Sequence, residues 1–261
     1  MAIIGVDRVT ERAEEFDLLR AAGVTIELEP IGQGPVFDNR ETPSGRIQTC
    51  IQPGDPLPVV AIRPAWSRAP SWLIVPVSAE TRPDWAAAVP SLAQLTLGWQ
   101  GLLRVLVAGR RTRRKPPEQT ALVSRADIVG VSRHDLGWNA SVHDALRLLR
   151  PGARLIVTDG ARGGAIGTAG DPARSRQLRY RALPARQVDP TGAGDVFLAA
   201  FAAASLIPGR ASSSGSAPTA DDVRWAAAAA ALAVEGVGLA AVPDRAAVEA
   251  RLRAEPAGAG G

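Results

Sequence analysis

Several residue types are scarce in this sequence, and each scarcity excludes a class of site. The chain has 261 residues and a single cysteine, Cys50. One thiol cannot build a disulfide framework, and without a thiolate cluster no structural zinc site is expected. A chain without disulfides suits a reducing compartment, so we predict a cytoplasmic location.

Lysine is equally scarce, because Lys115 is the only one. A P-loop needs a lysine in the pattern Gly-x-x-x-x-Gly-Lys-Ser/Thr, and a protein kinase needs a lysine on a strand. Neither can be built around Lys115. No Gly-x-Ser-x-Gly nucleophile elbow occurs, and neither histidine, His134 or His143, has a matching serine or cysteine, which argues against hydrolase chemistry. We interpret His134 as a solvated loop residue.

The sequence pI of 10.4 overstates the basic character, because the net charge is only +4. With one lysine and one tyrosine, Tyr180, almost nothing titrates between neutrality and the arginine pKa. Arg110 to Lys115 is the only basic run, and two prolines follow it, which indicates an exposed loop. A nucleic-acid footprint would spread over one face with aromatics interleaved, so no nucleic-acid partner is expected. Nucleic-acid binding through this run is kept as an alternative that would depend steeply on salt.

Long apolar runs are also lacking. The longest, near 196–207 and 225–234, fall short of the roughly 20 residues that a membrane span requires. Charged residues from Asp7 onward interrupt the start of the chain before the apolar region of a signal peptide could form. We therefore expect no membrane partner. With 46% hydrophobic residues the chain can bury one large core, predicted as a domain over 1–254 with a flexible tail at 255–261.

The most informative segment that is present is the string DPTGAGDVF at residues 189–197. Gly192 and Gly194 let the backbone turn tightly and approach a ligand closely. The first amides of the helix expected over 196–206 have no intrahelical acceptor, so they can point at an anion. Asp195 then stands where its carboxylate can face a substrate hydroxyl. The alternative is a plain tight turn followed by a helix-favouring acid.

The whole string resembles the Asp-Thr-x-Gly-Ala-Gly-Asp signature of the ribokinase-like (PfkB) carbohydrate kinases. The resemblance implies that Asp195 is the catalytic base, which takes the proton from the substrate hydroxyl. Such a site suits phosphoryl transfer, in which positioning and charge neutralisation supply most of the catalysis. The resemblance also implies an anion hole for the transferring phosphoryl group, formed by the amides of Gly192, Ala193 and Gly194.

Other residues of the string take roles from the same resemblance. Thr191 is expected at the nucleotide, and Asp189 is expected to help position a monovalent cation. Pro190 departs from the family, which usually has threonine there, but it fixes one φ angle without touching the amides that matter.

A second segment, Leu155 to Ala165, is an apolar strand that runs into a glycine-rich turn. It resembles the family's Thr-x-Gly-x-x-Gly segment, which lies against the nucleotide phosphates, and Thr158, Gly160 and Gly163 match it. Taken alone, the pattern is what many strand-to-loop connections look like. Its place shortly before the main motif gives it weight.

A third segment, Ala126 to Asp135, is a buried-looking strand that ends in polar residues. The family commonly carries Asn-x-x-Glu here, which organises magnesium and its waters around the phosphates. This sequence has Ser132 and Asp135 in those places. A shorter acid can still hold a magnesium-bound water, because magnesium keeps several waters and needs few direct protein ligands.

Helical and strand patterns alternate along the chain, which predicts helices on both sides of a mostly parallel sheet. The resemblance makes this a three-layer α/β/α sandwich, ribokinase-like, with a small partial β-lid. The segment 24–51 reads as the lid, a small antiparallel excursion of three strands. Candidate lid contacts to the sugar are Asn39, Arg46 and Gln48. The periodicities predict helices over 10–22, 141–149 and 221–234, and strands over 72–77, 24–29, 35–39 and 46–51.

The resemblance implies an ATP-dependent phosphotransferase that acts on a hydroxyl of a sugar or polyol, with ATP and Mg²⁺ as cofactors. It allows a monovalent cation and a homodimer. Family members usually open with a core strand, further lid strands and a Gly-Gly segment that grips the sugar, and this chain is expected to begin after them. The alternative is a non-catalytic nucleotide- or sugar-binding pseudokinase of the same fold.

Overall fold

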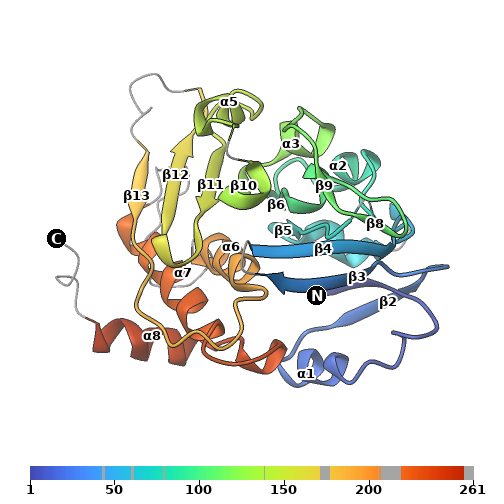
Figure 1. Cartoon of the computed structure of the whole chain (residues 1–261), viewed down its shortest axis with the longest axis horizontal. Helices are drawn as coiled ribbons and strands as arrows, with labels where there is room; N and C mark the ends of the chain where they lie inside the picture. Colours follow the sequence, from blue (N-terminus) through green and yellow to red (C-terminus); the bar gives the residue numbers. More distant parts are fainter. Residues whose placement is uncertain are drawn as a thin grey trace.

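The structure is a computed structural model that describes residues 1–42, 45–59, 62–78, 80–137, 139–170, 177–204, 206 and 219–255 (Figure 1). Its largest sheet has six strands in the order β13-β12-β11-β10-β6-β5. Strands β5, β6, β10 and β11 run parallel to one another. β12 and β13 continue the sheet beyond β11 as antiparallel strands. The strands are β5 Ser71–Ile74, β6 Gln94–Gly98, β10 Ile128–Ser132, β11 Arg154–Thr158, β12 Gly164–Thr168 and β13 Leu178–Tyr180.

Helices cover both faces of this sheet, as the side chains of β10 show. Successive residues of a strand point to opposite faces. Val129 and Val131 pack into one apolar cluster with residues of the helices on one side, and Ile128 packs into a second cluster with Phe197 and Leu198. The predicted three-layer sandwich is therefore confirmed. The first side carries α2 Asp84–Ala88, α3 Ala121–Arg125 and α5 Val142–Leu146, and the second carries α6 Ala193–Ala204 and α7 Ala220–Ala233, with α8 Arg245–Ala254 packed on α7.

The start of the chain forms a sheet of its own. β1 Ala2–Val6 pairs in parallel with β2 Ile26–Pro30, and α1 Glu15–Ala21 connects them. The prediction that 24–29 belongs to an antiparallel excursion is wrong, because an unexpected partner, β1, lies beside it. The helix predicted from residue 10 also begins later. The Asp7 carboxylate accepts hydrogen bonds from the amides of Val9 and Thr10, which holds a turn there instead.

The remainder of the predicted lid is an antiparallel sheet of β3 Val36–Thr42, β4 Gly45–Gln52 and β8 Arg110–Arg111, called the lid sheet below. A separate two-strand ladder joins β7 Arg104–Val105 to β9 Arg113–Arg114. The basic run was predicted as an exposed loop, and this is wrong in part. Its arginines are exposed, but they form two short strands that pair with β4 and β7. In Figure 1 the lid strands β3 and β4 are the blue arrows crossing below β5 and β6.

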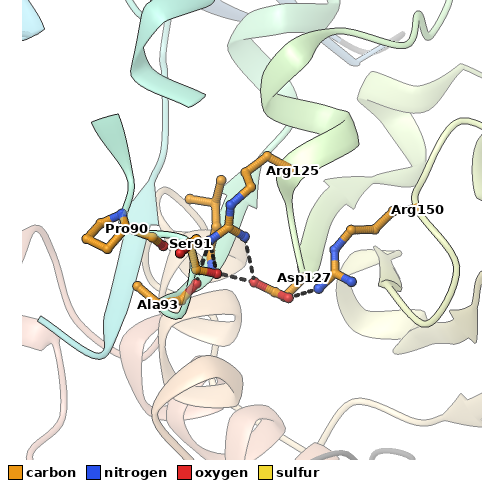
Figure 2. A network of polar contacts seen from close by, with 7 residues as sticks. Pro90, Ser91, Ala93, Arg125, Asp127 and Arg150 are labelled. Carbon is orange, nitrogen blue, oxygen red and sulfur yellow. Dashed lines mark hydrogen bonds and ion pairs between the residues drawn. The ribbon is translucent and has the colours of Figure 1, made fainter. Parts of the chain in front are cut away.

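A polar network fixes the amino-terminal ends of the parallel strands (Figure 2). Asp127 accepts from the amide of Leu95 at 2.7 Å and pairs with Arg125 and Arg150. The other end of the Arg125 guanidinium donates to three backbone carbonyls just before β6, those of Pro90, Ser91 and Ala93. The network therefore ties the beginnings of β6, β10 and β11 together with polar contacts that lie partly away from water.

Other predicted boundaries shift by a few residues. β5 ends at Ile74 rather than 77. α5 is shorter than the helix expected over 141–149, and α7 is shifted by one residue from the helix expected over 221–234. The most consequential shift is in α6, which begins at Ala193 and so takes part of the glycine loop into its first turn. In the described part of the chain, no helix combines the length and apolar character that a membrane crossing requires.

Candidate active site

The loop before α6 is anchored at both ends. The amides of Val188 and Asp189 donate to the carbonyl of Val234 at the end of α7, at 2.7 and 3.2 Å. The Asp189 carboxylate accepts from the amide of Thr191 at 2.9 Å. Gly192 then adopts a φ of 80°, which a residue with a side chain would rarely take, and the chain enters the helix. Asp189 therefore acts as a local turn-former here.

The backbone at the start of α6 is not crowded by other residues. A Cβ atom placed on Gly192 or Gly194 would meet nothing within 4 Å. Within the described residues, the amides of these two glycines have no hydrogen-bond acceptor, while the Ala193 amide makes a long bond of 3.3 Å to the Pro190 carbonyl. The predicted anion-hole residues thus lie together in a helix first turn, with at least two amides available to a ligand.

Close packing of α6 against β10 places Asp195. A Cβ atom on Gly130 of β10 would lie 2.7 Å from a methyl carbon of Leu198, so the absence of a side chain at Gly130 lets the helix approach. Asp195 is three residues before Leu198 and therefore lies about one turn towards the carboxyl-terminal end of β10. Ligands bind at that end of the strands in parallel α/β sheets.

The environment of Asp195 changes its acidity. Its side chain is exposed to solvent, yet protein around the carboxylate raises its pKa above the usual value by desolvation. The positive charge of Arg104 lowers this pKa, and the negative charge of Asp135 raises it. An accessible carboxylate that is nevertheless partly desolvated is typical of a base at a reactive site.

Arg104 and Asp135 form a buried ion pair beside Asp195. The Arg104 Nη2 atom lies 3.0 Å from Asp135 Oδ1, and the two side chains are only 10% and 9% exposed. The other carboxylate oxygen of Asp135 accepts from the Ser132 hydroxyl at 2.7 Å, and the Ser132 Oγ in turn caps α4 Arg133–Leu136 by accepting from the Asp135 amide. The sequence predicted Ser132 and Asp135 at this site, but it did not point to Arg104.

No pattern in the sequence would have singled out Arg104. It is one of 30 basic residues. It enters the site because η3 Gln100–Leu103 turns the chain after β6, and because β7 then pairs with β9. The only available signal is its position a few residues after a parallel strand, on the side where functional residues gather.

The glycine-rich segment after β11 lies next to the same site. Thr158 and Ser132 are register partners on adjacent strands, so the ends of β10 and β11 bring them together. Gly160 has a φ of 55° and open space around its Cα. Gly163 differs, because a Cβ atom there would lie 2.0 Å from the Tyr180 carbonyl. Packing against β13 therefore explains Gly163 without a ligand.

The proposed sugar contacts lie on the lid sheet. Asn39 and Gln48 are cross-strand partners, and the Gln48 side chain donates to the Asn39 side chain at 2.9 Å. The Arg46 side chain lies outside the described residues. No described contact joins Asn39 or Gln48 to Asp195, so the structure leaves their role in substrate binding as a prediction.

The structure gives limited support to the predicted magnesium site at Ser132 and Asp135. Among the described residues, no three acidic, histidine or cysteine side chains cluster in a way that could hold a metal ion. Both Asp135 oxygens already have protein partners, and one of these is a cation. Direct coordination of Mg²⁺ by Asp135 does not fit this arrangement, and a contact through a metal-bound water stays a prediction.

Comparison with known proteins agrees with this geometry. The pfkB family carbohydrate kinase profile matches residues 110–245, just over half of the chain, including the glycine-rich segment, Asp195 and Asp135. The chain belongs to this family. Among curated proteins, no sequence matches this pfkB family member significantly.

Solved structures share the fold of this pfkB family member over nearly its whole length. The ribokinase of Thermotoga maritima is 20% identical with a TM-score of 0.67, and 96% of this chain covers 80% of that one. A pyrophosphate-dependent kinase in the ribokinase family, in complex with sulfate, is 18% identical with a TM-score of 0.72, with coverage of 95% and 85%. The Arabidopsis thaliana ribokinase in complex with ribose and ATP is 20% identical with a TM-score of 0.62, with coverage of 96% and 80%. At identities of 18–20%, the structural similarity shows that this chain has the ribokinase fold.

Proposed function

We propose that this pfkB family member transfers the γ-phosphoryl group of ATP to a hydroxyl of a sugar or related polyol. The observation that carries the proposal is the position of Asp195, an accessible but partly desolvated carboxylate next to the open amides of Gly192 and Gly194. A base and an anion-binding turn side by side are the two parts that in-line phosphoryl transfer needs.

In the proposed mechanism, Asp195 accepts the proton of the acceptor hydroxyl. The hydroxyl oxygen forms a bond to the γ-phosphorus as the bond to the β–γ bridging oxygen breaks, and ADP leaves. The amides of the α6 first turn donate to the γ-phosphoryl oxygens, where negative charge is spread in the transition state. Desolvation raises the pKa of Asp195, which makes its carboxylate a stronger base than that of an ordinary aspartate.

The nucleotide phosphates are placed between the α6 turn and the loop after β11, so Thr158, Gly160, Gly163 and Thr191 are the proposed nucleotide contacts. Mg²⁺ is expected to arrive bound to the nucleotide and to supply charge neutralisation at the phosphates. The Asp135 carboxylate does not fit direct coordination of this ion, because both of its oxygens have protein partners. Asp189 stays the proposed contact for a monovalent cation.

We propose that the acceptor binds between Asp195 and the lid sheet, with Asn39, Arg46 and Gln48 as its contacts. Ribokinase and a pyrophosphate-dependent kinase are among the similar structures. Ribose and myo-inositol are therefore sensible first acceptors for assay, and pyrophosphate should be tested beside ATP as the donor.

Replacing Asp195 with Asn tests the proposal. Loss of a general base typically costs 10²- to 10⁴-fold, so kcat should fall by about 10³-fold while ATP binding is nearly unchanged. The measurements are coupled ADP production over a panel of sugars and calorimetric titration with ATP. Asp144→Asn is a matched control, because Asp144 is an exposed acid near the start of α5, outside the site. Unchanged turnover of Asp195→Asn would overturn the mechanism.

A non-catalytic nucleotide-binding protein of the same fold is the second candidate. The Arg104–Asp135 pair favours it, because it engages the acid expected to organise magnesium. ATP binding without ADP production with any acceptor, and without release of phosphate from pyrophosphate, would support this second candidate over the first.

A further inference from the structure

Arg104 has bonding capacity that the protein does not use. A guanidinium carries five N–H donors in a planar fork. Within the described residues, only its Nη2 atom has an acceptor, the Asp135 carboxylate, although the side chain is nine-tenths buried. The Nε and Nη1 atoms have no partner there and are not fully buried, so their N–H groups are free to bind a ligand that accepts hydrogen bonds.

A second arginine stands directly opposite the first. Arg104 of β7 and Arg114 of β9 are register partners in an antiparallel ladder, so their side chains leave the same face. Two like charges in such a pair repel each other. Arg114 has no carboxylate partner in the described part of the chain, and its guanidinium contacts the imidazole of His134 instead. The Asp135 carboxylate offsets the charge of Arg104 alone, so an anion that contacts both guanidinium groups would offset the charge of Arg114 as well.

This basic pair lies next to the proposed phosphoryl-transfer site. Arg104 holds Asp135 and acts electrostatically on Asp195, and His134 precedes Asp135 in α4. The backbone amide of Lys115 donates to the Leu103 carbonyl at 2.9 Å, which extends this ladder by one residue towards η3. The two guanidinium groups are therefore carried by backbone that is hydrogen-bonded on either side of the pair along the strands.

We propose that Arg104 and Arg114 form a two-arginine subsite that binds a phosphate group of a substrate beside Asp195. Phosphate fits because guanidinium forks bind its oxygens in pairs, with charge-assisted hydrogen bonds. The phosphate has two sources, the polyphosphate chain of the donor or a phosphate already carried by the acceptor. The placement next to Asp195 rests on the proposed function, whereas the anion site itself does not.

The decisive variant is Arg114→Gln, since the Arg114 side chain is exposed and its loss should leave the fold intact. The matched control is Arg113→Gln, which removes the same charge from the adjacent position of β9, whose side chain points to the opposite face. Binding of pyrophosphate and of tripolyphosphate is measured by calorimetry at fixed ionic strength. We expect Arg114→Gln to weaken binding by about tenfold or more, as loss of a charged hydrogen bond does, and Arg113→Gln to change it much less.

Measurements of KM for the donor and for the acceptor distinguish the two sources of phosphate. If the donor occupies the subsite, Arg114→Gln raises KM for ATP or pyrophosphate and leaves KM for a neutral sugar unchanged. If the acceptor occupies it, the increase appears in KM for a sugar phosphate. Arg114→Lys should restore only part of the affinity, because an ammonium group lacks the planar fork.

The calorimetric binding measurement also distinguishes failure of the subsite from failure of the proposed kinase activity. A chain that shows no turnover but loses pyrophosphate affinity in Arg114→Gln and not in Arg113→Gln would support the subsite while refuting the kinase activity. Equal affinities for the wild type, Arg114→Gln and Arg113→Gln would overturn the subsite, whatever the turnover.

Discussion

At the scale of single residues, the acidity of Asp195 depends on burial and on two neighbours of opposite charge. Burial raises its pKa most, Arg104 lowers it and Asp135 raises it. A base works only when deprotonated, so activity is lost as the pH falls through this raised pKa. Because the two neighbours act with opposite signs, their replacement should move the acidic limb of the pH profile in opposite directions.

We expect Arg104→Gln to shift the acidic limb of kcat/KM to higher pH, because the group that lowers the Asp195 pKa is gone. Asp135→Asn should shift the same limb to lower pH. The measurement is initial rate against pH from 4.5 to 8 at constant ionic strength. A limb that does not move in either variant would mean that another group limits the rate at low pH.

The ionised Asp195 carboxylate should also lower the free energy of unfolding of the protein. The pKa of its carboxyl is raised in the folded state, so ionisation is harder there than in the unfolded chain, and the penalty is present at any pH above the folded pKa. Asp195→Asn is therefore expected to raise Tm at pH 7.5. As the pH falls through the folded pKa the carboxyl protonates, and the difference in Tm should shrink towards zero once the pH is also below the ordinary aspartate pKa. A lower Tm at pH 7.5 would contradict this account.

At the scale of elements, the contact between α6 and β10 places the base. Gly130→Ala would insert a methyl group 2.7 Å from a Leu198 methyl carbon, within the packed second layer. Overpacking of this kind costs about 1–3 kcal/mol of unfolding free energy. It should also lower kcat, because the helix that carries Asp195 has to shift.

Leu198→Ala in the same chain provides the control for Gly130→Ala. It removes the group that clashes, so the double variant should be more stable than the sum of the two single effects predicts. Urea unfolding of the four proteins gives this coupling. Strictly additive free energies would show that Leu198 is not what the added methyl group meets.

The same scale shows what the sequence could and could not predict. The glycine loop with Asp195 was found because its meaning is local: glycines, open amides and an acid follow one another in the chain. The pairing of β2 with β1, and of the basic run with β4 and β7, depends on partner strands outside each segment, so periodicity within the segment gave no sign of either. Arg104 was missed for the same reason, because its role comes from a ladder with residues ten positions later.

At the scale of the whole molecule, the two ends of the parallel strands have separate tasks. The Asp127 network ties the amino-terminal ends together, and Asp195, Ser132 and Thr158 lie at the carboxyl-terminal ends. Five-residue strands separate the two by about 15 Å. Stability and substrate binding should therefore respond to different substitutions.

Asp127→Asn tests this separation. It leaves Arg125 and Arg150 without their carboxylate and should cost about 1–2 kcal/mol of unfolding free energy, since the side chains are only partly buried. KM for donor and acceptor should stay unchanged at 25 °C. The measurements are urea unfolding and steady-state kinetics, and a change in KM of tenfold would show that the network reaches the site.

The stretch from Arg104 to Arg114 belongs to two ladders at once. β8 is bonded to β4 in the lid sheet, and β9, which begins two residues after β8 ends, is bonded to β7 in a separate ladder. With one residue between them, the two strands cannot move far apart. A substrate that draws the lid sheet inward would also move Arg114, and a phosphate bound by Arg114 would favour one position of the lid. By reciprocal linkage, the affinity for one substrate would then depend on the presence of the other.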